Sequence, residues 1–197
     1  MNFAGKDIFE LFGKTISNIN PGVSFNEAIA ELLNCKGKII TSGMGKAGNA
    51  MLKFSSILCS LGFPSAYLHP GESAHGDLGL IGKDDILFLA STSGQTREIL
   101  EIIDLSRNIN VGSIIGITSH KDSPLREKVD IVIDMGPIQE AKVSDDFDLP
   151  PTTSILVMLA ITDAIAILMA RAKGVTKEDY SKYHHGGYLG KQARREI

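Results

Sequence analysis

The fold of this chain is decided by the stretch Ile86-Leu87-Phe88-Leu89-Ala90-Ser91-Thr92-Ser93-Gly94-Gln95-Thr96-Arg97-Glu98, which an apolar helical pattern at 99–105 continues. The five apolar residues predict a buried strand, and hydroxyl side chains with one glycine fill the turn before the helix. Free backbone N–H groups and the helix dipole favour a bound phosphate at such a turn. Because the turn has no lysine, a nucleotide P-loop is disfavoured, and a small phosphate ester such as a sugar phosphate is the expected ligand.

The same alternation of strand and helix extends along the chain. Apolar segments predict five strands, at 38–41, 65–68, 85–90, 113–118 and 129–134. Helical patterns separate most of them, which predicts an α/β fold: a three-layer α-β-α sandwich around a five-stranded parallel sheet. Ligands of such sheets bind beyond the carboxyl ends of the strands. The loops expected there are 42–48, 69–77, 91–96 and 135–150.

The length of 197 residues suits one domain, with N-terminal helices over 1–36, a sheet core over about 38–173 and a tail over 174–197. A net charge of −3 provides no basic face for nucleic acid. Cys35 and Cys59 lie in apolar helical context, which predicts reduced core residues, and no N-terminal signal pattern is visible, so a cytoplasmic protein is expected. The apolar stretch 155–170 is shorter than the ~20 residues of a spanning helix, and we interpret it as part of a core or interface helix. The prolines 150–151 are expected to start this helix, and Gly174 to end it.

The segment Gly43-Met44-Gly45-Lys46-Ala47-Gly48 follows a predicted strand and matches G-x-G-x-x-G. A dinucleotide site would need an acidic residue at the end of the second strand, where the sequence has Leu68-His69-Pro70 instead. Two interpretations stay open. The glycines could serve close packing of strand and helix, or Lys46 could supply a positive charge for a phosphate or an enediolate.

Three further groups could carry chemistry, and each has a structural alternative. His75 lies in the polar segment 69–77 and could be a general acid or base, or that segment could be a solvated loop. Glu98 follows the hydroxyl-rich turn and could remove a proton or merely complement the helix dipole. His184 and His185 follow a predicted helix, 176–183, where histidine often serves as a cap. Asp163, within the apolar helix, is interpreted as structural.

Taken together, these pieces resemble the sugar isomerase (SIS) domain of arabinose-5-phosphate isomerases. The resemblance covers about residues 38–191 and rests on five blocks in the order of the family: 42–48, 69–79, 91–98, 151–154 and 184–190. It implies a flavodoxin-like SIS domain that interconverts D-ribulose 5-phosphate and D-arabinose 5-phosphate through a cis-enediol, in the supply of Kdo for lipopolysaccharide or capsule. It also implies a cytoplasmic homotetramer in which a tail histidine completes a neighbour's site. No cofactor is expected.

The resemblance also assigns roles to single residues. The candidate catalytic residues are Lys46, His75, Glu98, Glu140 and His184. Glu98 or Glu140 would be the base, His75 and His184 would open the sugar ring or move protons, and Lys46 would stabilise negative charge. The candidate substrate- and phosphate-binding residues are Ser42, Gly43, Ser91, Ser93, Gly94, Thr96, Thr153 and His185. No metal is required for the reaction, although an inhibitory zinc at His75 and His184 and feedback binding of CMP-Kdo in the same pocket are further expectations.

Three features differ from the family pattern. The family usually carries a pair of CBS regulatory domains after the SIS domain, and residues 1–197 include none, so a form without them is expected. The family tail His-Pro-Gly-Gly reads His184-His185-Gly186-Gly187 here, which leaves the choice between the two histidines open. After Glu140-Ala141 the segment 142–149 is longer than its family counterpart. The alternatives are an isomerase for a hexulose or heptulose phosphate and a non-catalytic sugar-phosphate sensor.

Overall fold

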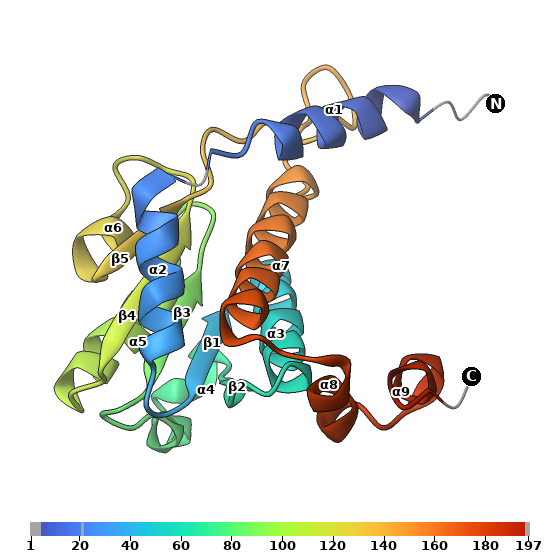
Figure 1. The fold of residues 1–197 in the computed structure, drawn as a ribbon. Helices are drawn as coiled ribbons and strands as arrows, with labels where there is room; N and C mark the ends of the chain where they lie inside the picture. Colours follow the sequence, from blue (N-terminus) through green and yellow to red (C-terminus); the bar gives the residue numbers. More distant parts are fainter. Residues whose placement is uncertain (1–4, 21, 196–197) are drawn as a thin grey trace.

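Five parallel strands form one sheet in the order β2-β1-β3-β4-β5 in the computed structural model, which describes residues 5–20 and 22–195 (Figure 1). The strands are β1 (Ile39–Gly43), β2 (Ser65–Tyr67), β3 (Ile86–Ala90), β4 (Ser113–Thr118) and β5 (Ile131–Asp134). The expected five-stranded parallel sheet is therefore confirmed. The chain changes direction across the sheet between β1 and β3, and a ligand crevice is expected at the carboxyl ends of these two strands.

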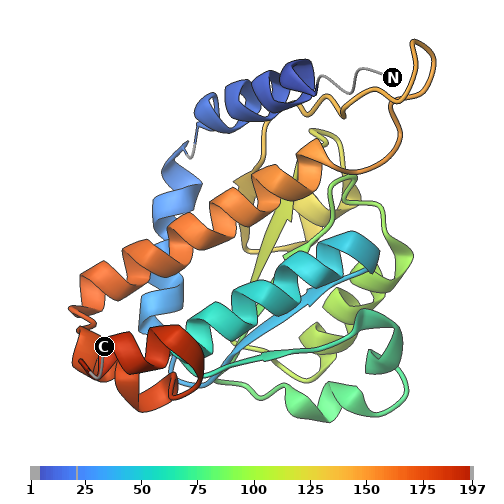
Figure 2. The same cartoon turned by 90° about the vertical axis from the view of Figure 1, so that its right-hand side faces the viewer.

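Helices cover both faces of this sheet (Figures 1 and 2). The helical elements are α1 (Lys6–Ser17), α2 (Gly22–Asn34), α3 (Gly45–Ser60), α4 (Pro70–Ser73), the 3₁₀ turn η1 (Asp77–Leu80), α5 (Arg97–Asn108), α6 (Pro124–Lys128), α7 (Thr153–Lys173), α8 (Lys177–Tyr183) and α9 (Gly187–Ala193). Side chains of α2, α3 and α7 join one side of the sheet in a core around Phe54 and Phe88. On the other side, α5 and α6 pack Ile102 and Leu125 against the strands. Because both faces are covered, every residue of β1, β3 and β4 is buried.

Helix α7 contains the apolar stretch that the sequence analysis assigned to a core or interface helix. It is long and apolar enough to cross a membrane, but 56% of its apolar window is buried inside the fold. Met158, Ile165 and Met169 are fully buried in the core that α7 shares with α3 and the sheet. The core role is confirmed, because the apolar side chains are used for packing within the chain.

Three local expectations were wrong. The segment 69–77 is not a continuous loop, because Pro70 begins the helical turn α4, a position where the fixed φ of proline favours a helix start. Helix α7 begins at Thr153 rather than at the prolines 150–151, since the N–H groups that the Glu140 carboxylate caps belong to residues 152–154. Cys59 is exposed, whereas Cys35 is partly buried, and both are free thiols.

A buried carboxylate joins β1 to β3 at the amino-terminal edge of the sheet. Asp85 is 2% exposed and accepts hydrogen bonds from the N–H groups of Lys38, at 2.6 Å, and Gly82, at 2.8 Å. The Lys38 ammonium lies 3.0 Å from its second oxygen. Burial alone would raise the pKa of Asp85, but these hydrogen bonds and the Lys38 charge outweigh it and lower the pKa. The network stabilises the edge of the sheet opposite the ligand crevice.

Candidate functional site

The turn at 91–96 is closed by its own hydroxyl groups. Ser91 is buried, its Oγ accepts the N–H of Gly94 at 3.0 Å, and it lies 2.9 Å from Thr96 Oγ1. Ser93 Oγ accepts the N–H of Gln95 at 3.2 Å. Thr96 occupies the N-cap position of α5, yet its side chain makes no capping hydrogen bond to the helix. The first-turn N–H groups of α5 are therefore left without that cap, which is the arrangement that suits an anionic ligand.

Gly94 is required by the shape of this turn. Its φ is +62°, a left-handed conformation that side chains rarely adopt, and a Cβ there would lie 2.4 Å from Ser123 Oγ. Gly94 does not line the pocket that opens above this turn. Its contribution to phosphate binding is therefore to let the turn close rather than to contact a ligand with a side chain.

A pocket of about 310 Å³ opens above this turn, where β1 and β3 end. Its lining residues are Met44, Lys46, Ala47, Ala90, Ser91, Thr92, Ser93, Thr96, His120, Pro151 and Ile155. Four of the predicted site residues meet here: Lys46, Ser91, Ser93 and Thr96. The pocket combines hydroxyls, an uncapped helix terminus and a lysine, and such groups together can hold a phosphorylated small molecule.

Lys46 is an exposed residue in the first turn of α3. It also borders an adjoining surface hollow of about 570 Å³ with Asn49, Tyr67 and His69. Within residues 5–20 and 22–195, the ammonium of Lys46 forms no ion pair. Its charge is therefore available to a ligand in the pocket. This agrees with the interpretation in which Lys46 supplies a positive charge for a phosphate or an enediolate.

The glycines of that segment serve packing. A Cβ on Gly43 would lie 2.9 Å from the backbone of Ala47, and a Cβ on Gly48 would lie 2.4 Å from the carbonyl oxygen of Gly43. Close approach of β1 and α3 therefore depends on both residues. Ser42 is fully buried and its hydroxyl donates to the carbonyl oxygen of Leu68 at 2.7 Å. This hydroxyl thus has a backbone partner, and Ser42 does not line the pocket, so the structure gives it a packing role between β1 and the end of β2, and its phosphate-binding role stays a prediction.

Glu140 caps α7. One carboxylate oxygen accepts the N–H groups of Thr152 at 2.8 Å and Thr153 at 2.7 Å, and both oxygens lie 3.3 Å from the N–H of Ser154. The carboxylate thus occupies the positive end of a 21-residue helix. Thr153, a predicted phosphate-binding residue, is buried outside the pocket lining, and its hydroxyl has no hydrogen-bond partner among the described residues.

Glu98 differs from Glu140 in having few contacts. It lies in the first turn of α5, directly after the hydroxyl-rich turn, and its side chain is 26% exposed. Its carboxylate approaches only the neighbouring Arg97, at 3.8 Å, among the polar contacts within the described ranges. Neither glutamate lines the pocket, but Glu98 has the carboxylate with free acceptor capacity.

The predicted histidines do not meet in one chain. His75 is exposed at the carboxyl edge of the sheet, just after α4. His184 stacks on Tyr180, with ring centroids 4.9 Å apart, and its Nδ1 lies 3.4 Å from Ser60 Oγ at the last residue of α3. Lys46 lies at the other end of that helix, roughly 21 Å away at 1.5 Å per residue. The tail helix α8 lies beside the C-terminal end of α3, and α9 packs on α8 (Figures 1 and 2).

The expected zinc site and the role of His185 are affected by this placement. Because His75 and His184 lie at different ends of the fold, one chain does not form a zinc site from them, and the part of the chain that the structure describes contains no cluster of three metal-binding side chains. His185 is exposed, its carbonyl oxygen accepts from Arg194 Nη1 at 3.1 Å, and it is not in the pocket lining.

Among the pocket residues that the sequence did not predict, His120 has the side chain best suited to acid–base chemistry. His120 lines the pocket from the segment that follows β4 (Ser113–Thr118). Its neighbours Ser119 and Lys121 carry no motif, so only its position could have indicated it. A polar residue just beyond the carboxyl end of a strand that neighbours β3 is the signal that could have found it.

Comparisons with known proteins agree with this fold. The sequence profile of the SIS domain matches residues 32–168. The chain is 42% identical to arabinose 5-phosphate isomerase KpsF of Escherichia coli, over 82% of this chain and 50% of that relative. It is 38% identical to arabinose 5-phosphate isomerase KdsD of Pseudomonas aeruginosa, over 87% of this chain and 51% of that relative. The chain thus spans about half the length of these curated relatives.

Among solved structures, the protein c3406 of Escherichia coli CFT073 in complex with arabinose 5-phosphate is 31% identical, with a TM-score of 0.84, and the match covers 93% of this chain and 100% of that one. A Bacteroides fragilis protein, assigned as a phosphosugar isomerase involved in capsule formation, is 38% identical with a TM-score of 0.88, and the match covers 93% of this chain and 96% of that one. The sheet order, the pocket at its switch point and these likenesses lead to one conclusion: the chain belongs to the SIS domain family.

Proposed function

We propose that this protein is an aldose–ketose isomerase that interconverts D-arabinose 5-phosphate and D-ribulose 5-phosphate. The observation that carries the proposal is the pocket at the ends of β1 and β3, where the closed turn 91–96 and the uncapped start of α5 face Lys46. This combination provides a phosphate site and a nearby positive charge. Relatives named arabinose 5-phosphate isomerase, and a structural neighbour in complex with arabinose 5-phosphate, support the substrate class.

In this proposal the phosphate binds the N–H groups at the start of α5 and the hydroxyls of Ser93 and Thr96. A base removes a proton from C1 of the ketose or from C2 of the aldose, which gives a cis-enediol. A proton moves between O1 and O2, and the proton on the base then returns to the other carbon. The Lys46 ammonium stabilises the negative charge that develops on the oxygens, and His120, on the pocket wall, is placed to exchange protons with them.

Glu98 is the base in this mechanism rather than Glu140. The Glu140 carboxylate already accepts backbone N–H groups at the start of α7, so its oxygens are engaged in capping that helix. Glu98 retains free lone pairs and belongs to the same first turn of α5 that would bind the phosphate. Movement of its side chain toward the pocket is required, since Glu98 does not line it.

The tail histidine would act on a neighbouring subunit. His184 lies at the far end of α3 from its own pocket, so a homotetramer in which one chain supplies His184 to another's site satisfies both the geometry and the expectation from the family. An inhibitory zinc would then bind His75 and His184 from different chains. Cytoplasmic location, supply of Kdo for lipopolysaccharide or capsule, and feedback binding of CMP-Kdo in the pocket belong to the same proposal.

A coupled assay with a panel of pentulose, hexulose and heptulose phosphates tests this function. The expected result is turnover of D-ribulose 5-phosphate, with kcat/KM at least tenfold above that for the longer sugars. Preference for a hexulose or heptulose phosphate would contradict the proposed substrate but would still support an aldose–ketose isomerase. Tight binding of the panel without turnover would identify a sugar-phosphate sensor and contradict the isomerase.

A further inference from the structure

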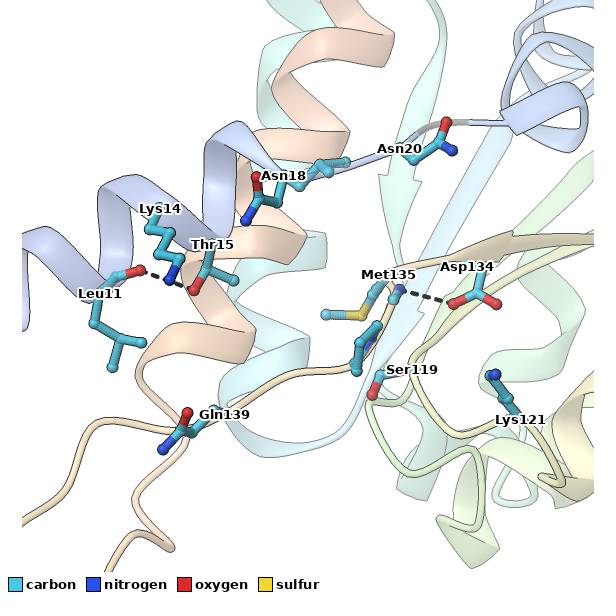
Figure 3. A pocket seen from close by; sticks show the side chains of 13 residues that line it. Leu11, Lys14, Thr15, Asn18, Asn20, Ser119, Lys121, Asp134, Met135 and Gln139 are labelled. Carbon is cyan, nitrogen blue, oxygen red and sulfur yellow. Dashed lines mark hydrogen bonds between the residues drawn. The ribbon is translucent and has the colours of Figure 1, made fainter.

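A second pocket, larger than the candidate active site, lies beside the ends of β4 and β5. It has a volume of about 800 Å³. Figure 3 shows the side chains that line it. One wall is α1 and the residues that follow it, and the other wall is formed by the segments after β4 and β5. The lining residues are Leu11, Lys14, Thr15, Asn18, Ile19, Asn20, Ser119, Lys121, Asp134, Met135, Gly136, Pro137 and Gln139. None of these residues is shared with the 310 Å³ pocket.

The lining of this pocket carries unneutralised positive charge. Lys14 and Lys121 form no ion pair within the described part of the chain. The carboxylate of Asp134 is already engaged, because Arg126 Nη2 donates to it at 2.7 Å and the N–H of Gly136 donates at 2.7 Å. Two lysines thus remain for an anionic ligand, with no free carboxylate in the lining to oppose it.

The other polar groups of the pocket suit hydroxyl groups of a ligand. The side chains of Asn18, Ser119 and Gln139 have no hydrogen-bond partner among the residues described here. Thr15, by contrast, donates to the carbonyl oxygen of Leu11 at 2.8 Å. An amide offers both a donor and an acceptor, and a hydroxyl offers both as well, which is the pattern that adjacent sugar hydroxyls require. The buried side chain of Met135 supplies an apolar surface for the C–H face of such a molecule.

Two segments connect this pocket to the candidate active site. His120 lines the active-site pocket, whereas the residues on either side of it, Ser119 and Lys121, line the second one. The segment after β5 also continues from Gln139 to Glu140, which fixes the start of α7, and Ile155 of α7 lines the active-site pocket. A ligand that shifts residues 119–121 would therefore move His120, and one that shifts residues 135–140 would move the start of α7, which carries Ile155.

We propose that this second pocket binds an anionic, hydroxyl-rich small molecule, a sugar acid or a sugar phosphate, and that its occupancy changes the activity of the neighbouring site. The binding claim stands on the charge and polarity of the pocket alone. The regulatory claim rests on the proposed isomerase function, so the two are tested separately.

Binding is measured with 6-phosphogluconate, which carries a carboxylate, a phosphate and several hydroxyls, by calorimetry and by hydrogen exchange of peptides covering 11–20. Gluconate and arabinose 5-phosphate separate the two anionic groups, and glucose serves as the neutral probe. The combined Lys14→Gln/Lys121→Gln variant should weaken binding at least tenfold and abolish the protection of 11–20. The matched control, Lys36→Gln/Lys83→Gln, removes two exposed lysines outside both pockets and should leave binding unchanged.

Several outcomes would overturn the binding claim. The first is absence of hydrogen-exchange protection in residues 11–20 with every probe, and the second is an equal loss of binding in both double variants. The third is a change of oligomeric state in Lys14→Gln/Lys121→Gln without ligand, which would show that another chain fills the pocket. The regulatory claim requires 6-phosphogluconate to change kcat or KM of the wild type at least twofold and not those of Lys14→Gln/Lys121→Gln. If the protein has no isomerase activity, the proposed function fails while the exchange measurement still decides the binding.

Discussion

The turn at 91–96 and the tail at 174–195 both carry predicted functional residues, but the fold treats them differently. The turn is completed within one strand–turn–helix unit, in which Ser91 bonds both Gly94 and Thr96, and the start of α3, after the neighbouring strand β1, brings Lys46 to it. The tail holds His184 against Ser60 and Tyr180, at the end of α3 remote from Lys46. A short-range site can therefore form in one chain, whereas the tail residue lies away from the pocket of its own chain.

The largest loss of activity is expected from substitution of Lys46, the lysine that lines the pocket above the turn 91–96. Lys46→Ala should reduce kcat/KM for D-ribulose 5-phosphate by ~10²–10⁴-fold, because the developing negative charge loses its nearest cation. The coupled assay measures it. Lys53→Ala, on the same helix but paired with Asp163, is the matched control and should keep activity within about threefold. Equal losses in both variants would show that the charge of Lys46 has no special role.

The contribution of the tail is measured by mixing two inactive variants. His184→Asn should lower turnover by ~10²-fold, in the range of a lost general acid or base. Co-expression of Lys46→Ala and His184→Asn chains should then restore activity, since some pockets in a mixed oligomer receive an intact Lys46 and an intact His184 from different chains. His185→Asn is the control that distinguishes the adjacent histidine. Absence of any recovery would contradict the exchange of tails between chains.

Substitution of the two glutamates, Glu98 and Glu140, tests which of them is the base. Glu98→Gln should lower kcat by ~10²-fold or more with a small change in KM, because the base is lost. Glu140→Gln keeps one acceptor oxygen for the start of α7 and should lower the melting temperature while reducing kcat less than tenfold. Normal turnover of Glu98→Gln would remove Glu98 from the mechanism and return the role of base to Glu140.

The smallest effect on activity is expected at the amino-terminal edge, away from both regions. Asp85→Asn should cost about 1–3 kcal/mol in the free energy of unfolding, since the buried hydrogen bonds from Lys38 and Gly82 lose a charged acceptor, while kcat stays unchanged. The pKa of Asp85 is lowered in the folded state, so its stabilisation is complete above the unfolded value of about 3.9 and is lost as the pH falls below it. Urea unfolding at pH 7 and pH 3 should show this difference between wild type and variant shrinking, and a constant difference would contradict the role of the charge.

Much of the fold could be predicted because its signals are local. Five apolar segments separated by helical patterns specify a parallel sheet covered on both faces, and the hydroxyl-rich turn after β3 indicates where a pocket lies at its carboxyl end. The helical turn at Pro70 and the cap of α7 by Glu140 were missed. The cap joins residues 12 positions apart through an irregular segment, and no periodicity in the sequence records such a contact.

The candidate residues of one turn, Ser91, Ser93 and Thr96, lie together in one pocket, whereas the hydrogen-bond partners of other candidate side chains were not anticipated. Ser42 has the residue type and position of a phosphate ligand, but the carbonyl oxygen of Leu68 takes its hydroxyl. His120 lacked any motif and became visible only once β4 was placed beside β3. Hydrogen-bond competition and strand order are set by the whole fold, and for this reason the sequence pattern alone does not determine them.

The most direct test of the central claim is a crystal structure of the protein soaked with D-arabinose 5-phosphate. The expected result is the phosphate group at the turn 91–96, within hydrogen-bond distance of Ser93 or Thr96 and of the N–H groups that begin α5, with the sugar carbons directed toward Lys46. A turn that stays empty at saturating ligand, or a phosphate bound elsewhere, would contradict the proposed function.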